Sequence, residues 1–289
     1  MSADEAALLA AIAADPGSDH PRLVYADWLD DHGQGVRAEF VRVQCEVARL
    51  GARPEAADPL ARRLWERQEA LHAGHVRELF AGAECLLGRN PTFRRGFVAE
   101  ATLDVRDFLP LAAELAVLLP PPEVRVRGFG GEVPGFFACP HLGCVTAAGM
   151  YDAWAHLRMD DGLVAAGLRR AAGRLTRLRV LDLSGGQLGD ADWAELAAAP
   201  LPALRALDLS NCGLTDEAVS ALLDGRLGRR LTKLVLDGNP LTDATAYDLI
   251  DRFALGQALP VLHLGRLELV SFTAQRALRA AAGDRCQFS

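Results

Sequence analysis

The chain has 289 residues, half of them hydrophobic, and its 31 Lys and Arg against 38 Asp and Glu give a formal net charge of -7. This length and apolar content allow one or two buried cores, and the acidic balance argues against nucleic acid as a partner. The N-terminus is acidic where a secretory signal is basic, and no segment reaches the roughly 18 consecutive apolar residues of a membrane span. We expect a cytoplasmic protein with six reduced, scattered cysteines and no membrane partner.

The first 50 residues predict three helices. Ser2 and Glu5 have the spacing of a capping box at the start of the first helix. Pro21 suits the first turn of a second helix, which Gly33 would end. A third helix over residues 36–50 has one apolar stripe and a charged face that stays in water. The side chains of that stripe are Phe40, Val43, Val47 and Leu50.

A fourth helical segment, "LARRLWERQEALHAGHVRELF", is strongly charged. Asp58 is its expected cap and Pro59 its first residue. Its leucines at positions 64, 71 and 79 are expected to pack on a neighbour. We therefore divide this part of the chain into a helical N-terminal domain over residues 1–52 and a charged connector helix over 53–92.

From residue 93 onward, strand and helix patterns alternate. "FRRGFVAEATL", "EVRVRGF" and "LGCVTAAGM" predict strands, and "DVRDFLPLAAELAVLLPPP" predicts a helix between the first two. Side chains on a strand alternate between its two faces, so half of these residues face outward. The outward positions expected on the second and third strands are Arg125 and Arg127, then Thr146 and Ala148.

The second half of the chain repeats itself. "LRVLDLSGGQLGD" from Leu178 returns as "LRALDLSNCGLTD" from Leu204 and "LTKLVLDGNPLTD" from Leu231, and "LPVLHLGRLEL" from Leu259 is a weaker copy. The copies begin 26, 27 and 28 residues apart. A fixed period of this length is typical of a solenoid, in which stacked repeats share one core.

Each copy fits the pattern L-x-x-L-x-L-x-x-N/C-x-L, in which a polar side chain can bond the backbone of the bend. Cys212 and Asn239 stand at that position in the second and third copies, whereas the first copy has Gly186 there and its last leucine at Leu188. The pattern resembles the leucine-rich repeat family, and the period resembles its ribonuclease-inhibitor-like subclass. The resemblance implies an α/β solenoid over residues 93–289, clearest over 178–265, with helical return segments and parallel strands on a concave face.

A second resemblance covers about the first 50 residues. "RLVYADWLDDHG" followed by "RAEFVRVQCEVARL" is similar to the bacterial repeat-companion domain, which precedes leucine-rich or other repeats. This resemblance supports a small all-α N-terminal domain ahead of the solenoid and implies no biochemical activity.

The concave face is the candidate binding site, since its side chains point away from the repeat core. We expect a basic N-terminal part and an acidic middle that suit a charge-patterned protein or peptide. The alternative is an ordinary hydrated strand surface. Val180 also faces outward, and the candidate residues are Arg125, Arg127, Asp182, Ser184, Asp208, Ser210, Val235, Asp237 and His263.

Two other clusters have residue types that bind metals. One is the acidic stretch "YADWLDDHG", with Asp27, Asp30, Asp31 and His32, and the other is "CPHLGC", with Cys139, His141 and Cys144. The first is better explained as a capped, packed helix, and the second lacks the fourth ligand of a structural zinc site. We therefore expect no metal and no cofactor.

The chain has none of the common catalytic motifs, so we expect a protein-protein interaction module or scaffold and no enzyme. Two alternatives stay open. One is an activator of a separate enzyme such as a small GTPase, which would need an arginine or asparagine projecting from a loop, with Asn90, Arg94 and Arg95 as candidates. The other is a structural part of a larger assembly.

Overall fold

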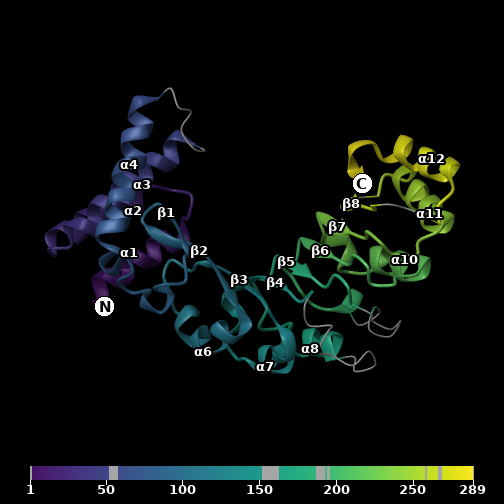
Figure 1. The fold of residues 1–289 in the computed structure, drawn as a ribbon, viewed down its shortest axis with the longest axis horizontal. Helices are drawn as coiled ribbons and strands as arrows, with labels where there is room; N and C mark the ends of the chain where they lie inside the picture. Colours follow the sequence, from purple (N-terminus) through teal and green to yellow (C-terminus); the bar gives the residue numbers. More distant parts are fainter. Residues whose placement is uncertain are drawn as a thin grey trace. The chain divides into compact units, whose positions relative to one another are not determined.

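A computed structural model describes residues 2–51, 58–151, 163–186, 193, 196–257, 259–265 and 269–288 (Figure 1). The chain forms two compact units. The first consists of Met1–Thr102 and Ala113–Val124, and the second of Leu103–Ala112 and Arg125–Ser289. The domain boundaries predicted at residues 52 and 92 stay predictions. None of the helices in the described ranges has the length and apolar character needed to cross a bilayer.

Five helices come first along the described part of the chain, and they belong to the first unit. They are α1 (Ala3–Ala14), α2 (His20–Asp31), α3 (Gly35–Leu50), α4 (Pro59–Gly74) and α5 (Val76–Leu79). The Ser2 hydroxyl accepts a hydrogen bond from the Glu5 backbone N–H at 3.1 Å, and Asp58 caps α4 in the same way. The fourth predicted helix is interrupted after Gly74, because His75 has a non-helical backbone with φ of -134°.

The first unit also contains a β-hairpin where one strand was expected. Strands β1 (Thr92–Arg94) and β2 (Phe97–Asp104) pair antiparallel through a two-residue turn. Arg95 and Gly96 form this turn with φ of 52° and 87°, as the twist of a two-residue hairpin requires. A side chain at Gly96 would collide with Val41 of α3, so glycine lets the hairpin turn lie directly on that helix.

Helix α3 buries two faces, and the single stripe predicted for it is therefore wrong in part. Phe40 and Val43 of that stripe are buried with Leu71 and Leu79, but Leu50 is exposed. The second face, which includes Val41, joins a core shared with α1 and α2. Helix α3 contacts α2, α4, α5 and β1, so more of its circumference is dry than one stripe allows.

The later elements alternate strand and helix, as the sequence predicts. The helices are α6 (Val105–Leu115), α7 (Val133–Ala138), α8 (Leu163–Ala171), α10 (Asp216–Asp224), α11 (Asp243–Ala254) and α12 (Phe272–Ala282). The strands are β3 (Glu123–Arg127), β4 (Val145–Gly149), β5 (Val180–Asp182), β6 (Ala206–Asp208), β7 (Lys233–Val235), β8 (Val261–His263) and β9 (Cys286–Gln287). Strands β4 to β9 pair parallel in chain order.

The repeat leucines form the core of the second unit. Leu181, Leu207, Leu234 and Leu262 are paired in register and fully or almost fully buried, and Cys286 continues the row on β9. Helices α10 and α11 lie on one side of these strands (Figure 1). The solenoid pattern is thus confirmed at the leucine positions, while Leu188 lies outside the described residues.

The register expected for β4 is wrong by one residue. Ala148 is paired with Leu181 and is buried, so it belongs to the core row. Thr146, two residues earlier, is also buried. The outward residues of β4 are therefore Ala147 and Gly149. Valine and alanine are too similar in polarity to set the register of this strand, which pairing with β5 decides.

Candidate functional site

The candidate site is the face of β5–β8 opposite the buried leucines, which we call the strand face. Two rows of side chains cross it in register. The first row is Val180, Ala206, Lys233 and Val261. The second row is Asp182, Asp208, Val235 and His263. Val180 and Lys233 are exposed and the others are half-buried, so a partner could touch both rows.

Asp182 and Asp208 have a structural task as well as an exposed position. Each uses Oδ1 to accept a hydrogen bond of 2.9 Å from a backbone N–H two residues on, at Ser184 and Ser210. The Ser210 hydroxyl also donates to Asp208 at 2.6 Å. These bonds hold the bend that follows each strand. No described residue donates to the Oδ2 atom of either aspartate, so that atom is available to a partner.

Asp237 differs from the other two aspartates. Its Oδ1 is buried with no hydrogen-bond partner in the described structure. Gly265, in the bend of the next repeat, has φ of 54°, and a Cβ atom there would come within 2.8 Å of the Asp237 carboxyl carbon. Asp237 is therefore packed against the following repeat and presents less of its carboxylate to a partner.

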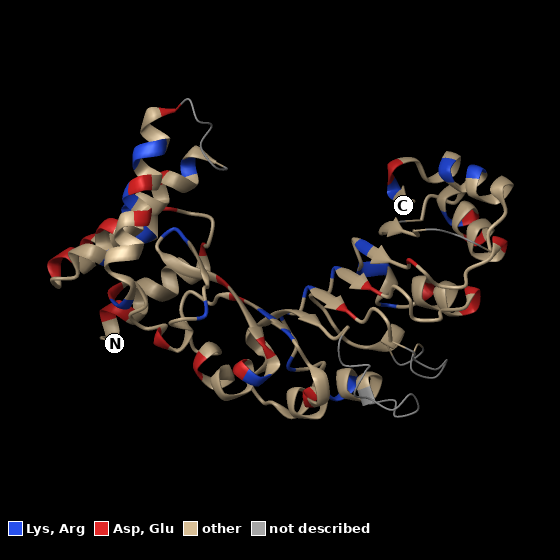
Figure 2. Cartoon of the chain, in the orientation of Figure 1, with Lys and Arg blue, Asp and Glu red and all other residues tan. Residues whose placement is uncertain are grey.

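Charge on the strand face changes along each strand. Figure 2 shows basic residues at the starts of the central strands and acidic residues at their ends. The basic residues are Arg179, Arg205 and Lys233. The sequence predicts a basic first part and an acidic middle. In the structure Lys233 lies in the first row, whereas Arg179 and Arg205 precede β5 and β6 and lie outside both rows.

Arg125 and Arg127 lie where the sequence predicts, on the outer face of β3. Both are exposed and alternate with the buried Val124 and Val126. The Arg127 Nε atom is 3.4 Å from the Asp104 carboxylate. This ion pair is largely hydrated, so it contributes little to stability and leaves Arg127 able to exchange partners.

Sequence reasoning missed most of the first row. Only Val180 was expected to face outward, and Ala206, Lys233 and Val261 were not among the candidates. These residues immediately precede the paired leucine of each repeat. The alternation of strand side chains is a signal that could have found them, because the residue before the leucine and the residue after it lie on the same face of the strand.

The acidic cluster of α2 is used in ion pairs. Arg42 of α3 lies 2.7 Å from Asp27 and 2.6 Å from Asp30. The His32 ring stacks on Trp28, and its Nδ1 is 2.7 Å from the Trp28 carbonyl oxygen. Helices α2 and α3 are thereby joined at their exposed edges.

The cysteines of "CPHLGC" lie in the core. Cys139 and Cys144 are buried, and the Cys144 thiol donates to the His141 carbonyl oxygen at 3.3 Å. Burial raises the pKa of Cys144 to about 11, so it is a neutral thiol near pH 7. The described ranges contain no group of three or more His, Cys, Asp or Glu side chains placed to hold a metal ion.

The residues considered for an activator role lie near the hairpin of the first unit. Arg95 is in the turn, with its Nε 2.7 Å from the Asp19 carboxylate and most of its side chain covered. Arg94 and Asn90 are exposed, and Asn90 has φ of 47°. Arg95 therefore supports the turn, and of the three candidates Arg94 and Asn90 are the two whose side chains are exposed.

Comparison with known proteins identifies the repeat. A family model described as "Leucine Rich repeat" matches residues 202–223, which contain β6 and most of α10. The Tonsoku-like protein of Mus musculus is 37% identical over 128 residues, which is 42% of this chain and 9% of the mouse protein. The chain thus spans only a small part of that relative. Together with the paired leucine rows, these matches support a leucine-rich-repeat protein.

Proposed function

We propose that this leucine-rich-repeat chain is a non-enzymatic protein-interaction module that binds a protein or peptide on the strand face. The observation that carries the proposal is the pair of in-register rows on β5–β8, which offers apolar, basic and acidic groups at regular spacing. The spacing between neighbouring strands is constant, so a partner can meet several repeats at once.

The proposal also includes the subclass of the solenoid, the type of N-terminal domain and the cellular compartment. Short parallel strands joined by helices support a ribonuclease-inhibitor-like solenoid. Three packed helices at the start of the chain support a repeat-companion domain. Six free cysteines, five of them buried, fit a reducing compartment such as the cytoplasm.

A double variant tests the strand face without removing the bends. Asp182→Asn and Asp208→Asn together keep an oxygen that accepts the serine N–H and remove two negative charges. Adding Lys233→Glu reverses one charge of the first row. The variants are compared with the wild type by affinity capture from native lysate of the source cells, read by mass spectrometry. We expect the triple variant to recover a partner at about one tenth of its wild-type abundance.

The matched control changes the same kinds of charge on the helices. Glu217→Gln on α10 and Arg276→Gln on α12 alter exposed side chains, and capture should be unchanged. Melting temperatures of all variants should agree with that of the wild type. Equal recovery of every partner by the wild type and the strand-face variant would contradict the proposal.

The same capture experiment tests the activator alternative, and light scattering tests the structural one. An activator would recover a GTPase through Arg94 or Asn90, and the loss of that GTPase on substitution of either residue would replace our proposal. A structural component would self-associate, which light scattering of the purified chain detects.

A further inference from the structure

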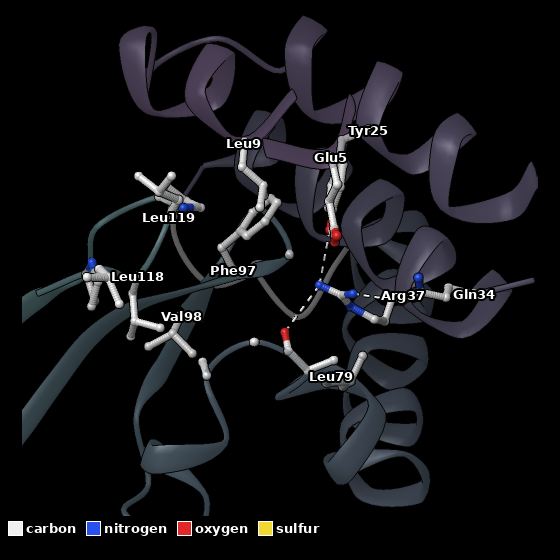
Figure 3. Close-up of a pocket in the computed structure, with 17 residues that line it drawn as sticks. Glu5, Leu9, Tyr25, Gln34, Arg37, Leu79, Phe97, Val98, Leu118 and Leu119 are labelled. Carbon is white, nitrogen blue, oxygen red and sulfur yellow. Dashed lines mark hydrogen bonds between the residues drawn. The ribbon is translucent and has the colours of Figure 1, made fainter. Parts of the chain in front are cut away.

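The first unit contains a cavity of about 490 Å³, open to solvent, that the proposed binding face does not use. It lies among α1, α2, α3, β2, the loop after α5 and the chain that follows α6 (Figure 3). Sites for small molecules commonly have volumes of about 300–1,000 Å³ and mostly apolar walls with a few polar groups. This cavity has that size and that mixture.

One wall of the cavity is a connected polar row. The Tyr25 hydroxyl donates to Glu5 Oε1 at 3.1 Å and accepts from Arg37 Nη2 at 3.3 Å. Arg37 also donates to Gln34 Oε1 at 2.7 Å and to the Ala81 carbonyl oxygen at 3.4 Å. Figure 3 shows these side chains together on one side of the cavity.

Tyr25 gives this row a fixed centre. The residue is fully buried, and its ring stacks on Trp28 and Phe97 with centroids 5.8 and 5.7 Å away. Burial raises its pKa, while Arg37 lowers it to a smaller extent. The hydroxyl is therefore neutral near pH 7 and keeps its proton as a donor.

Arg37 has donors to spare. Among the described residues, its guanidinium bonds only to neutral oxygen atoms, and two of the three bonds are longer than 3.2 Å. No carboxylate of the described chain lies within ion-pair distance of it. A guanidinium in partial burial binds a carboxylate more strongly than it binds such acceptors.

Glu5 places a negative charge beside this cation. Its Oε1 and the Arg37 Nη2 contact the same hydroxyl oxygen, so they are no farther apart than the sum of those two hydrogen bonds. A ligand with only a carboxylate would be repelled by Glu5, and one with only an amine by Arg37. A zwitterion whose two charged groups are joined through one carbon can place its carboxylate on Arg37 and its ammonium group on Glu5.

The opposite wall is apolar. Val98, Leu118 and Leu119 face the polar row across the space, and Leu9 and Phe97 lie between them (Figure 3). These side chains suit the body of a ligand whose charged end lies at Arg37 and Glu5.

We propose that this cavity binds a free apolar α-amino acid, with its carboxylate on Arg37, its ammonium group on Glu5 and its side chain among Leu9, Phe97 and Leu119. The site is distinct from the strand face and does not depend on it. An amino acid bound there would tie together segments from across the first unit and stabilise it by mass action.

Calorimetry on the full-length chain with three matched compounds tests the site. L-phenylalanine has both charged groups, 3-phenylpropionate lacks the ammonium group, and 2-phenylethylamine lacks the carboxylate. We expect L-phenylalanine to bind at least about tenfold more tightly than either analogue, since each analogue leaves one charge unanswered. L-leucine should also bind.

Variants assign the binding to the cavity. Arg37→Met and Glu5→Gln should each weaken L-phenylalanine binding by about tenfold or more. Leu119→Trp, at a side chain 40% exposed, should block binding from the apolar wall without touching the polar row. Arg42→Met is the matched control, because Arg42 lies on the same helix and pairs with α2 outside the cavity.

Three results would overturn the proposal. The first is that neither L-phenylalanine nor L-leucine binds the folded wild-type chain. The second is that 3-phenylpropionate binds as tightly as L-phenylalanine. The third is that Arg37→Met and Leu119→Trp both bind L-phenylalanine with wild-type affinity. Circular dichroism on each variant identifies any that fail to fold, and the two variants act on opposite walls.

Discussion

Asn239, in the bend after β7, bonds backbone groups of two adjacent repeats. Its side-chain oxygen accepts from the N–H groups of Cys212 and Leu214, both at 3.0 Å. Its side-chain nitrogen donates to the carbonyl oxygens of Leu209 and Leu236, at 2.9 and 2.8 Å. All of these groups are inside the solenoid, where water cannot replace a missing partner.

Cys212, at the equivalent position one repeat earlier, also hydrogen-bonds to backbone carbonyl groups. Its thiol donates to the carbonyl oxygens of Leu183 and Ser210 at 3.3 and 3.4 Å. Burial raises its pKa to about 12, so the donor proton is present at neutral pH. The Asn or Cys of the repeat pattern is thus a hydrogen-bonding residue, as the sequence predicts.

Replacing Asn239 with alanine should lower the free energy of unfolding by about 3 kcal/mol, because several buried groups lose their partner. Urea titration followed by circular dichroism measures this loss. Asn211→Gly is the control, since Asn211 is exposed and left-handed with φ of 55°, and glycine follows β7 at the matching Gly238. Its effect should stay within about 1 kcal/mol. Equal losses in both variants would contradict this role for Asn239.

The helices of the second unit are joined by caps that reach from one repeat to the next. Asp216, in the first turn of α10, accepts from the backbone N–H and the hydroxyl of Thr242, at 2.9 and 2.6 Å, and from Thr245. Asp243 of α11 likewise accepts from the Ser271 N–H at 2.6 Å. Each aspartate therefore supports its own helix start and the start of the next helix.

Removing the Asp216 charge should make the free energy of unfolding less dependent on pH in the acidic range. Burial alone would raise the pKa of Asp216, but the bonds from Thr242 and Thr245 outweigh burial and lower it below the usual 3.8. The charged form is thus favoured by folding, and its stabilisation is present above pH 3.8 and is lost as the pH falls through the lower folded value.

We expect Asp216→Asn to be about 1–2 kcal/mol less stable than the wild type at pH 7. This difference should shrink as the pH approaches 3. Urea titrations of both proteins from pH 7 to pH 3 provide the measurement. Glu217→Gln, at the exposed neighbouring position, should behave as the wild type. A difference independent of pH would show that the charge of Asp216 is not the stabilising feature.

At the scale of the whole molecule, the second unit depends on contacts between successive repeats. Each repeat buries its leucines against its neighbours, so β8 needs a neighbour on the edge that faces away from β7. Strand β9 pairs with β8, and its Cys286 lies beside Leu262. Phe288 continues this cover, since the Arg279 guanidinium of α12 lies 4.6 Å from its ring centroid.

Deleting residues 269–289 should expose β8 and α11 together. We expect a lower melting temperature and self-association, because an uncovered strand edge and apolar surface pair with other chains. Scanning calorimetry and light scattering measure the two effects. Arg276→Gln, at an exposed position of α12, is the control and should leave the melting temperature unchanged and the protein monodisperse. A truncated chain with an unchanged melting temperature would contradict the covering role of α12 and β9.

Local chemistry determined much of this fold. The repeated pattern predicts the leucines at 181, 207 and 234 and the bend residue Asn239, and residue spacing predicts the caps at Ser2 and Asp58, because each has a signal in the local sequence. The outward position of Asp182 and Asp208 follows from the same alternation.

Only the tertiary structure decided features that depend on distant segments. The register of β4 required pairing with β5, and the second buried face of α3 required the core that it shares with α1 and α2. The cavity at Arg37 is built from segments between Glu5 and Pro122, none of which has a local pattern that marks it. Periodicity records which side of an element is dry, but only packing determines what lies against it and what space is left.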